Sequence, residues 1–281
     1  MDKIEILNLV PKFLTFYKMA NKPDIDGEKR WSLWKEHYNF AAVPPGDEGK
    51  KMARNLLDTA WGIYPEYLTF IESWKPNEVK VREYLTKVKA LLGYNEPIDL
   101  VVVYFVGGFE NNPFVAPYDQ KRLALCLPVE NGDSEIFLAH ELTHIVHTQT
   151  ANLTGEWERT IASTILQEGL ATQVSKYLVP MHPDEQYIER ENGWLQSCKE
   201  YRAEIFSGVF PFLDDATSEA VTRFTFGNGT ANHEREAYYV GWELVNFLLA
   251  QGVTFKEMAS IQEKDIPDYV RNIFRKYSSS S

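Results

Sequence analysis

The segment His140-Glu-Leu-Thr-His144 constrains this chain more than any other feature of the sequence. Residues i and i+4 lie on one face of an α-helix, so the two imidazoles can reach one metal ion if this segment is helical. Glu135 and the apolar residues after it favour a helix over about 133–150. Glu141 lies beside both histidines, where a carboxylate can accept a proton from a metal-bound water. The segment therefore predicts a helix that carries a metal centre.

A catalytic zinc ion needs a third protein ligand and an open position for water. The extended pattern HExxHxxGxxH is excluded, because His147 and Thr150 occupy the positions of its glycine and its third histidine. Glu168 lies farther along, in a second apolar segment that is expected to be helical. A carboxylate inside such a helix is costly unless it has a partner. This favours Glu168 as the third ligand over Glu156 and Glu158, which lie at the intervening turn.

The HExxH segment followed by Glu168-Gly-Leu-Ala171 resembles the signature of the gluzincin metallopeptidases. This group includes thermolysin and the aminopeptidase-N-like enzymes, and the chain looks like a small bacterial predicted zinc-dependent protease of that clan. The resemblance covers about residues 100–175. It implies a zincin-like catalytic domain with one Zn²⁺ ion and with Glu141 as the general base. The zinc ligands that it implies are His140, His144 and Glu168.

The sequence departs from that pattern in two ways. The spacing between the ligands is a few residues longer than in the best-known members. Thr172 stands where thermolysin-like enzymes carry an aspartate that supports a zinc histidine. The resemblance therefore identifies no residue that hydrogen-bonds to a zinc-binding histidine and orients its ring.

Two shorter segments resemble parts of the aminopeptidase site. Gly107-Gly-Phe-Glu-Asn111 is similar to the GxMEN loop, which implies that Gly108, Glu110 and Asn111 bind substrate and that the glutamate grips a free amino terminus. The alternative is a polar turn that ends a strand. Tyr238-Tyr-Val-Gly241 resembles the YxxG of the same enzymes, which implies that Tyr238 donates a hydrogen bond to the developing oxyanion.

The role of Tyr238 has its own alternatives. Tyr238, Trp242, Val245 and Leu249 fall on one helical face, as in an aromatic core stripe. Tyr239 and His233 are substitutes for Tyr238 as the oxyanion donor. His147, one turn beyond His144, either supports the site or is a packed or surface histidine.

Composition excludes several classes of function. The chain has 29 Lys and Arg against 40 Asp and Glu, a net charge of −11, and shows no basic cluster for nucleic acid. Cys126 and Cys198 lack the spacing of a metal site and are expected to be buried free thiols in a reducing compartment. No apolar run is long enough to span a membrane, and the first twenty residues do not resemble a signal peptide. We expect a cytoplasmic protein.

The apolar pattern predicts an α+β fold, mainly α, with a small mixed sheet and an N-terminal helical lobe. The resemblance implies that the catalytic part is a thermolysin-like zincin domain. The domains expected are 1–95, a helical packing lobe, and 96–281, the catalytic domain, either separate or forming one compact unit. Strands are expected at 98–106 and 121–128, the second as a sheet edge for an extended peptide. The expected helices lie at 4–20, 28–40, 49–74, 78–92, 133–150, 157–178, 184–207, 230–251 and 264–277.

The function expected is a zinc-dependent peptidase that hydrolyses peptide bonds by Glu-assisted attack of zinc-bound water on a peptide or protein substrate. The alternative is a non-catalytic zinc-binding protein on the same scaffold, which the retained Glu141 disfavours. A di-iron helical bundle is disfavoured because the sequence has no second Glu-x-x-His. The choice between aminopeptidase and endopeptidase stays open and depends on Glu110.

Overall fold

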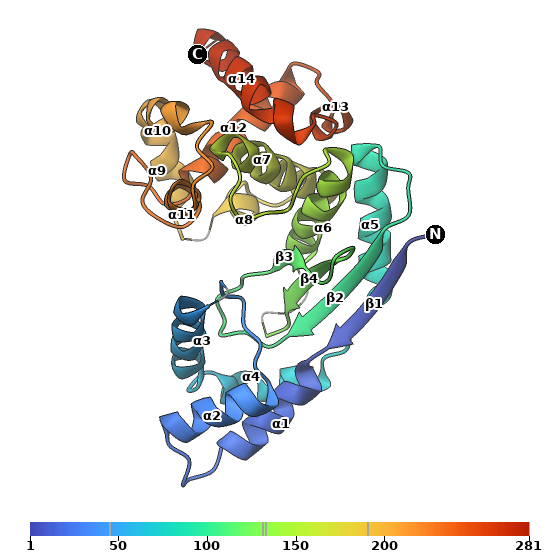
Figure 1. Cartoon of the computed structure of the whole chain (residues 1–281), viewed down its shortest axis with the longest axis vertical. Coiled ribbons are helices and arrows are strands. Elements are labelled where there is room, and N and C mark those ends of the chain that lie inside the picture. Colours follow the sequence, from blue (N-terminus) through green and yellow to red (C-terminus); the bar gives the residue numbers. More distant parts are fainter. Residues whose placement is uncertain (45, 131, 133, 190, 281) are drawn as a thin grey trace. The chain divides into compact units, whose positions relative to one another are not determined.

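The computed structural model describes residues 1–280, with the exception of 45, 131, 133 and 190 (Figure 1). The chain divides into two compact units, which do not follow one another in the sequence. The first comprises Met1–Arg82 and Pro97–Ser134, and the second comprises Glu83–Glu96 and Glu135–Ser281.

The first unit contains a four-stranded mixed sheet in the order β1-β2-β4-β3. The strands β1 (Lys3–Asn8), β2 (Asp99–Phe105) and β4 (Leu123–Pro128) run parallel, and β3 (Phe114–Pro117) pairs antiparallel with β4. Because β2 has neighbours on both sides, it is buried along nearly its whole length, as expected for a β-branched, aromatic run. The small mixed sheet and the mainly helical α+β fold are confirmed.

Two details of the sheet differ from the sequence-based expectation. Residues 3–8 form β1 and not the start of a helix over 4–20, because the segment pairs in parallel with β2 along its whole length. Its first four residues, Lys-Ile-Glu-Ile, also alternate polar and apolar. The strand at 123–128 is not a sheet edge, because the short β3 covers it. Since β3 has four residues and ends at a proline, its pattern is too short to recognise in the sequence.

The helices of the first unit are otherwise close to the expected ones. The expected helix at 49–74 is interrupted, and Pro65 lies in the first turn of its second half. The hydroxyl of Tyr64 donates to the carbonyl oxygen of Gly107 at 2.7 Å, and so ties this helix to the turn after β2. The helices are α1 (Val10–Ala20), α2 (Gly27–His37), α3 (Asp47–Ala60) and α4 (Tyr64–Ser73).

The second unit is built from helices. Its centre is α7 (Ile161–Leu178), which packs against α6 (Glu135–Thr150) and α12 (Glu236–Ala250). The expected helix at 184–207 is broken into three short ones. The remaining helical elements are α5 (Glu78–Leu92, which starts in the first unit), α8 (Glu185–Ile188), α9 (Trp194–Glu200), α10 (Arg202–Val209), η1 (Phe210–Phe212), α11 (Ser218–Thr225), α13 (Phe255–Ala259), η2 (Glu263–Asp265) and α14 (Ile266–Ser280).

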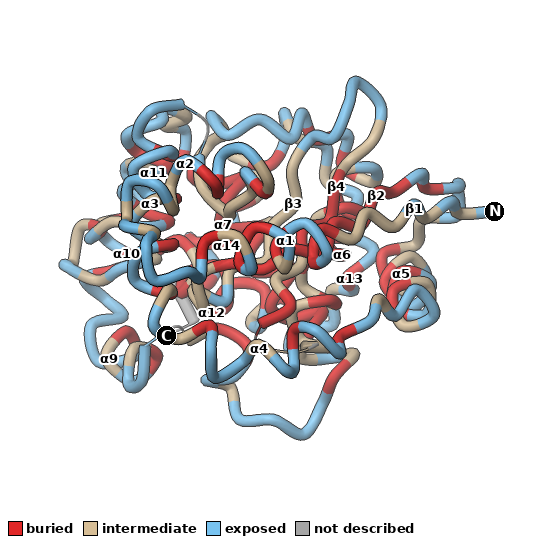
Figure 2. The backbone as a smooth tube through the Cα atoms, turned by 90° about the horizontal axis from the view of Figure 1, so that it is seen from below, coloured by how far each residue is buried: buried red, intermediate tan, exposed pale blue. Residues whose placement is uncertain are grey.

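Burial follows this arrangement. Most residues of α7 are buried, because helices pack against it on more than one side (Figure 2). Cys126 and Cys198 are both buried, as expected. Among the described residues, no helix is long and apolar enough to cross a membrane.

Candidate metal centre

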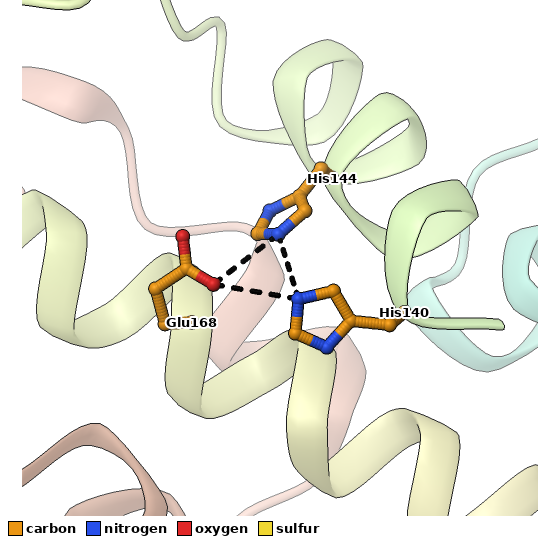
Figure 3. Close-up of side chains that lie close together, drawn as sticks. All are labelled: His140, His144 and Glu168. Atoms are coloured by element: carbon orange, nitrogen blue, oxygen red, sulfur yellow. Dashed lines mark hydrogen bonds and ion pairs between the residues drawn. The ribbon is translucent and has the colours of Figure 1, made fainter. Parts of the chain in front are cut away.

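Three side chains from α6 and α7 converge on one point (Figure 3). The Nε2 atoms of His140 and His144 lie 3.2 Å apart, and each lies 3.4 Å from Oε2 of Glu168. The histidines come from successive turns of α6, as the i, i+4 spacing predicts. Glu168 reaches them from the facing helix α7, whose start is capped by Thr160 accepting from the backbone N–H of Ser163.

The spacing of the three atoms fits a zinc ion. Ligand atoms about 2.0–2.1 Å from a tetrahedral zinc ion are separated by about 3.3–3.4 Å, close to the three distances observed. Oε2 of Glu168 is buried and has no hydrogen-bond partner among the described residues. Two imidazoles and a carboxylate are also the ligand set of one common class of catalytic zinc site. A metal ion at this point would bind that oxygen directly, together with the two imidazole nitrogens that lie 3.4 Å from it.

The number of ligands is informative as well. In the part of the chain that the structure describes, no fourth His, Cys, Asp or Glu belongs to this cluster. A structural zinc ion is usually held by four protein ligands, whereas a catalytic one keeps a position open for water or substrate. The three described residues of the cluster match the number of protein ligands in a catalytic zinc site.

The electrostatics of the cluster favour a positive charge between the three groups. Burial raises the pKa of Glu168, but His144 and His140 more than reverse this and hold it well below its usual value. Burial lowers the pKa of His144, yet Glu168 overcomes that effect and leaves it raised. For His140 burial dominates and the pKa is lowered, which favours the neutral imidazole that a metal ion requires.

Arg159 supports Glu168 from the side away from the histidines. Its Nη2 lies 3.7 Å from Oε1 of Glu168, and its Nε donates to Oγ1 of Thr164 at 3.1 Å. The two carboxylate oxygens are thus divided between the arginine and the histidines. Sequence reasoning missed Arg159, because it lies in the connection before α7 and no periodic pattern marks it. Thr172 does not replace it, since its hydroxyl donates to the backbone of its own helix.

Glu141 lies between the histidines on α6 and is buried. Burial raises the pKa of its carboxyl group to about 8, with His144 opposing and Glu168 adding to the shift. A carboxyl group with this pKa is mostly protonated at pH 7, and a cation bound beside it would favour the ionised form, which is the form that accepts a proton. The position and the environment of Glu141 thus suit proton transfer at this site.

Two glycines bring α7 and α12 into close contact. A Cβ atom on Gly241 would lie 2.3 Å from the carbonyl oxygen of Ile165, and one on Gly169 would lie 2.4 Å from that of Gly241. Only glycine permits this approach of the two backbones. Tyr238 lies one turn before Gly241, and Glu168 directly precedes Gly169. The crossing of the two helices therefore brings Tyr238 near Glu168. Gly169 and Gly241, one from each sequence motif, thus allow α7 and α12 to pack closely beside the cluster.

The environment of Tyr238 reflects this proximity. Burial raises the pKa of its hydroxyl to about 12, Glu168 adds to the shift, and Arg235 and Arg159 oppose it. The hydroxyl is therefore protonated at neutral pH and can donate a hydrogen bond. The guanidinium of Arg235 stacks on its ring, 3.8 Å from the centroid.

The two substitutes for Tyr238 are engaged elsewhere. The ring of Tyr239 is fully buried and packs edge-on against Trp194 and Phe206. The Nε2 of His233 lies 2.9 Å from Oγ of Ser197, and its Nδ1 lies 2.9 Å from the carbonyl oxygen of Ala231. Both ring nitrogens of His233 thus have partners within the surrounding loop.

The turn at 107–111 belongs to the first unit. The backbone N–H of Gly108 donates to Oε2 of Glu110 at 2.5 Å, while Phe109 and Asn111 adopt positive φ. Glu130, which sequence reasoning did not single out, is buried and accepts from the N–H of Gly107 at 2.9 Å. Burial raises the pKa of Glu130 to about 7. Contact of Gly108, Glu110 and Asn111 with a substrate stays a prediction.

His147 lies in the core of the second unit. Its side chain is fully buried, and both ring nitrogens lack a hydrogen-bond partner among the described residues. Burial lowers its pKa to about 3, so the ring is neutral. Of the two interpretations of His147, the packed histidine agrees with this position.

Comparison with known proteins identifies the family. A family model described as Predicted Zn-dependent protease (DUF2268) matches residues 105–268, which is more than half of the chain and includes the whole cluster. No curated protein and no solved structure matches the chain. The chain therefore belongs to the DUF2268 family of predicted Zn-dependent proteases.

Proposed function

We propose that the chain is a zinc-dependent peptidase of the gluzincin type, in which one zinc ion is held by the two histidines of α6 and the glutamate of α7. The observation that carries this proposal is the open cluster of His140, His144 and Glu168 with Glu141 on the same helix. When bound, zinc would activate a water molecule and polarise the peptide carbonyl. The family description supports the same class of reaction.

The chain's own residues supply the remaining chemistry. Glu141 accepts the proton of the attacking water and returns it to the leaving amine. The hydroxyl of Tyr238 donates a hydrogen bond to the carbonyl oxygen as it gains negative charge, a contribution of about 10²–10³ in rate for a well-placed donor. Arg159 holds the far oxygen of Glu168 and so keeps the near one directed at the histidines.

The test combines metal analysis with cleavage of a peptide library by the wild type and by Glu141→Gln. We expect about one zinc ion per chain in both proteins, and cleavage by the wild type alone. Glu204→Gln, a change of the same kind at an exposed position of α10, should keep full activity. Bound zinc with no cleavage by the wild type would favour a non-catalytic zinc protein. Equal cleavage by the wild type and Glu141→Gln would refute the role of Glu141.

The mode of peptide cleavage can be separated in the same assay. If Glu110 grips a free amino terminus, acetylation of the peptides should abolish cleavage, and Glu110→Gln should raise KM for free peptides. Unchanged cleavage of acetylated peptides would make the enzyme an endopeptidase. The turn at 107–111 would then have only a structural role.

A further inference from the structure

Two large aromatic side chains of the second unit are exposed and stack on each other. Trp157 lies in the connection between α6 and α7, and Phe226 follows the end of α11. Their ring centroids are 5.8 Å apart with an interplanar angle of 20°. The exposed fractions are 42% for Trp157 and 50% for Phe226. Exposed aromatic surface that is contiguous is commonly a site of interaction.

The pair is fixed in place from both sides. The indole Nε1 of Trp157 donates to Oγ of Ser218 at 3.0 Å, which ties the connection to the start of α11. The backbone N–H of Phe226 donates to the carbonyl oxygen of Thr222 at 3.0 Å and continues the last turn of that helix. A binding surface that is ordered in advance loses little entropy when a ligand arrives.

Arg159 connects this pair to the metal centre. Its guanidinium carbon lies 6.0 Å from the centroid of the Trp157 ring, and its Nη2 lies 3.7 Å from Glu168. These two contacts place the Trp157 ring at most about 11 Å from the Glu168 carboxylate, which is roughly three residues of an extended peptide. An extended peptide that is bound at the metal centre would therefore need about three residues to span the distance to the aromatic pair.

We propose that Trp157 and Phe226 form a subsite that binds an aromatic side chain of the peptide substrate, within about three residues of the bond that is cleaved. This rests on the proposed peptidase function. Stacked or edge-on contact with two rings favours an aromatic side chain over an aliphatic one of similar area. The subsite would thus set a preference for peptides that carry Phe, Tyr or Trp near the cleaved bond.

The primary test measures binding and not turnover. Zinc-loaded Glu141→Gln is titrated by calorimetry with peptides of equal length that carry a single Phe, Leu or Ser at each position in turn. At one position we expect Phe to bind about tenfold more tightly than Ser and about threefold more tightly than Leu. Trp157→Ala and Phe226→Ala in the same background should reduce both preferences to within about twofold.

Matched variants separate recognition from folding. Tyr177→Ala removes an aromatic residue of the same unit that is 64% exposed, and it should keep the preference. Trp157→Leu and Phe226→Leu keep apolar volume and should lose the preference for Phe over Leu. The proposal is overturned if Phe has no advantage at any position, or if folded Trp157 and Phe226 variants retain it. Absence of cleavage by the wild type with the binding preference intact would instead count against the peptidase function.

Discussion

Substitution of Gly241 by alanine tests whether the close crossing of α7 and α12 builds the site. The new Cβ would lie 2.3 Å from the carbonyl oxygen of Ile165 and 2.9 Å from the backbone N of Gly169. Ordinary C···O contacts are about 3.3 Å or longer, so the helices must separate by about 1 Å. Both opposing groups are helical backbone, which no change of rotamer can move.

The expected change in the free energy of unfolding of Gly241→Ala is the sum of two opposed effects. Overpacking of this kind costs about 1–3 kcal/mol, and we expect the upper part of that range because the clash is with backbone. Alanine gains up to about 1 kcal/mol over glycine in a helix interior. The net loss in the free energy of unfolding should therefore be about 2 kcal/mol, measured by urea denaturation.

The same displacement should affect catalysis more than metal binding. The proposed ligands lie on α6 and α7, whereas Tyr238 lies on α12, one turn before Gly241. A misplacement of about 1 Å can cost about 10²-fold in rate. We expect kcat/KM of Gly241→Ala to fall by about that factor, while zinc affinity changes only a few-fold.

The matched control is Gly227→Ala in the same unit, where a Cβ would meet its nearest atoms at 3.4–3.5 Å, an ordinary contact. This variant should unfold within about 0.5 kcal/mol of the wild type, as is usual for changes outside such tight contacts. If Gly241→Ala were as stable as Gly227→Ala and kept its activity, the close crossing would not be what positions the tyrosine.

Three further predictions concern protons and metal. His147 stays neutral in the fold with a pKa of about 3, whereas the unfolded chain protonates it near pH 6.5, so stability should fall by about 2 kcal/mol from pH 7 to pH 5. His147→Phe should lose that part of the pH dependence; urea denaturation at both pH values checks this, and an unchanged slope would contradict it. Glu130 has a pKa of about 7 against about 4.5 when unfolded, so its ionisation costs stability as pH rises through this range. The free energy of unfolding of Glu130→Gln should rise by about 2 kcal/mol relative to that of the wild type between pH 5 and pH 8, in the same assay. If the difference between the two proteins did not change with pH, Glu130 would not be protonated in the fold. Zinc at about 100 times its Kd should raise the free energy of unfolding by about 2.7 kcal/mol, reversibly with chelator. His144→Ala should abolish this response, and a thermal shift that persists would place the metal elsewhere.

The parts of the structure that sequence reasoning predicted are those set by local geometry. The i, i+4 spacing of the histidines requires a helix, and α6 places both rings toward one point. Glu168 could be chosen among many acidic residues because its apolar surroundings would not tolerate an unpaired charge. These are relations within one helix or between a side chain and its own segment.

The start of the chain shows where such reasoning fails. Residues 3–6 alternate polar and apolar, but the apolar residues of the segment 3–8 also continue the helical pattern of α1. What makes them a strand is the parallel pairing of Lys3–Asn8 with β2, more than ninety residues away in the sequence. Because that pairing is not local, no window of sequence could distinguish the two readings.

The connection between α6 and α7 carries two features that could not be predicted from the sequence. Arg159 reaches back to Glu168, and Trp157 reaches across to Phe226. Each contact joins a loop residue to a distant element, so no periodicity marks either one. The two contacts also share the same short stretch of chain, which couples the support of Glu168 to the position of the aromatic pair. A change in the length of residues 151–160 should therefore alter the position of the metal-directed carboxylate and the proposed side-chain preference together, whereas substitution of Trp157 alone should alter only the preference.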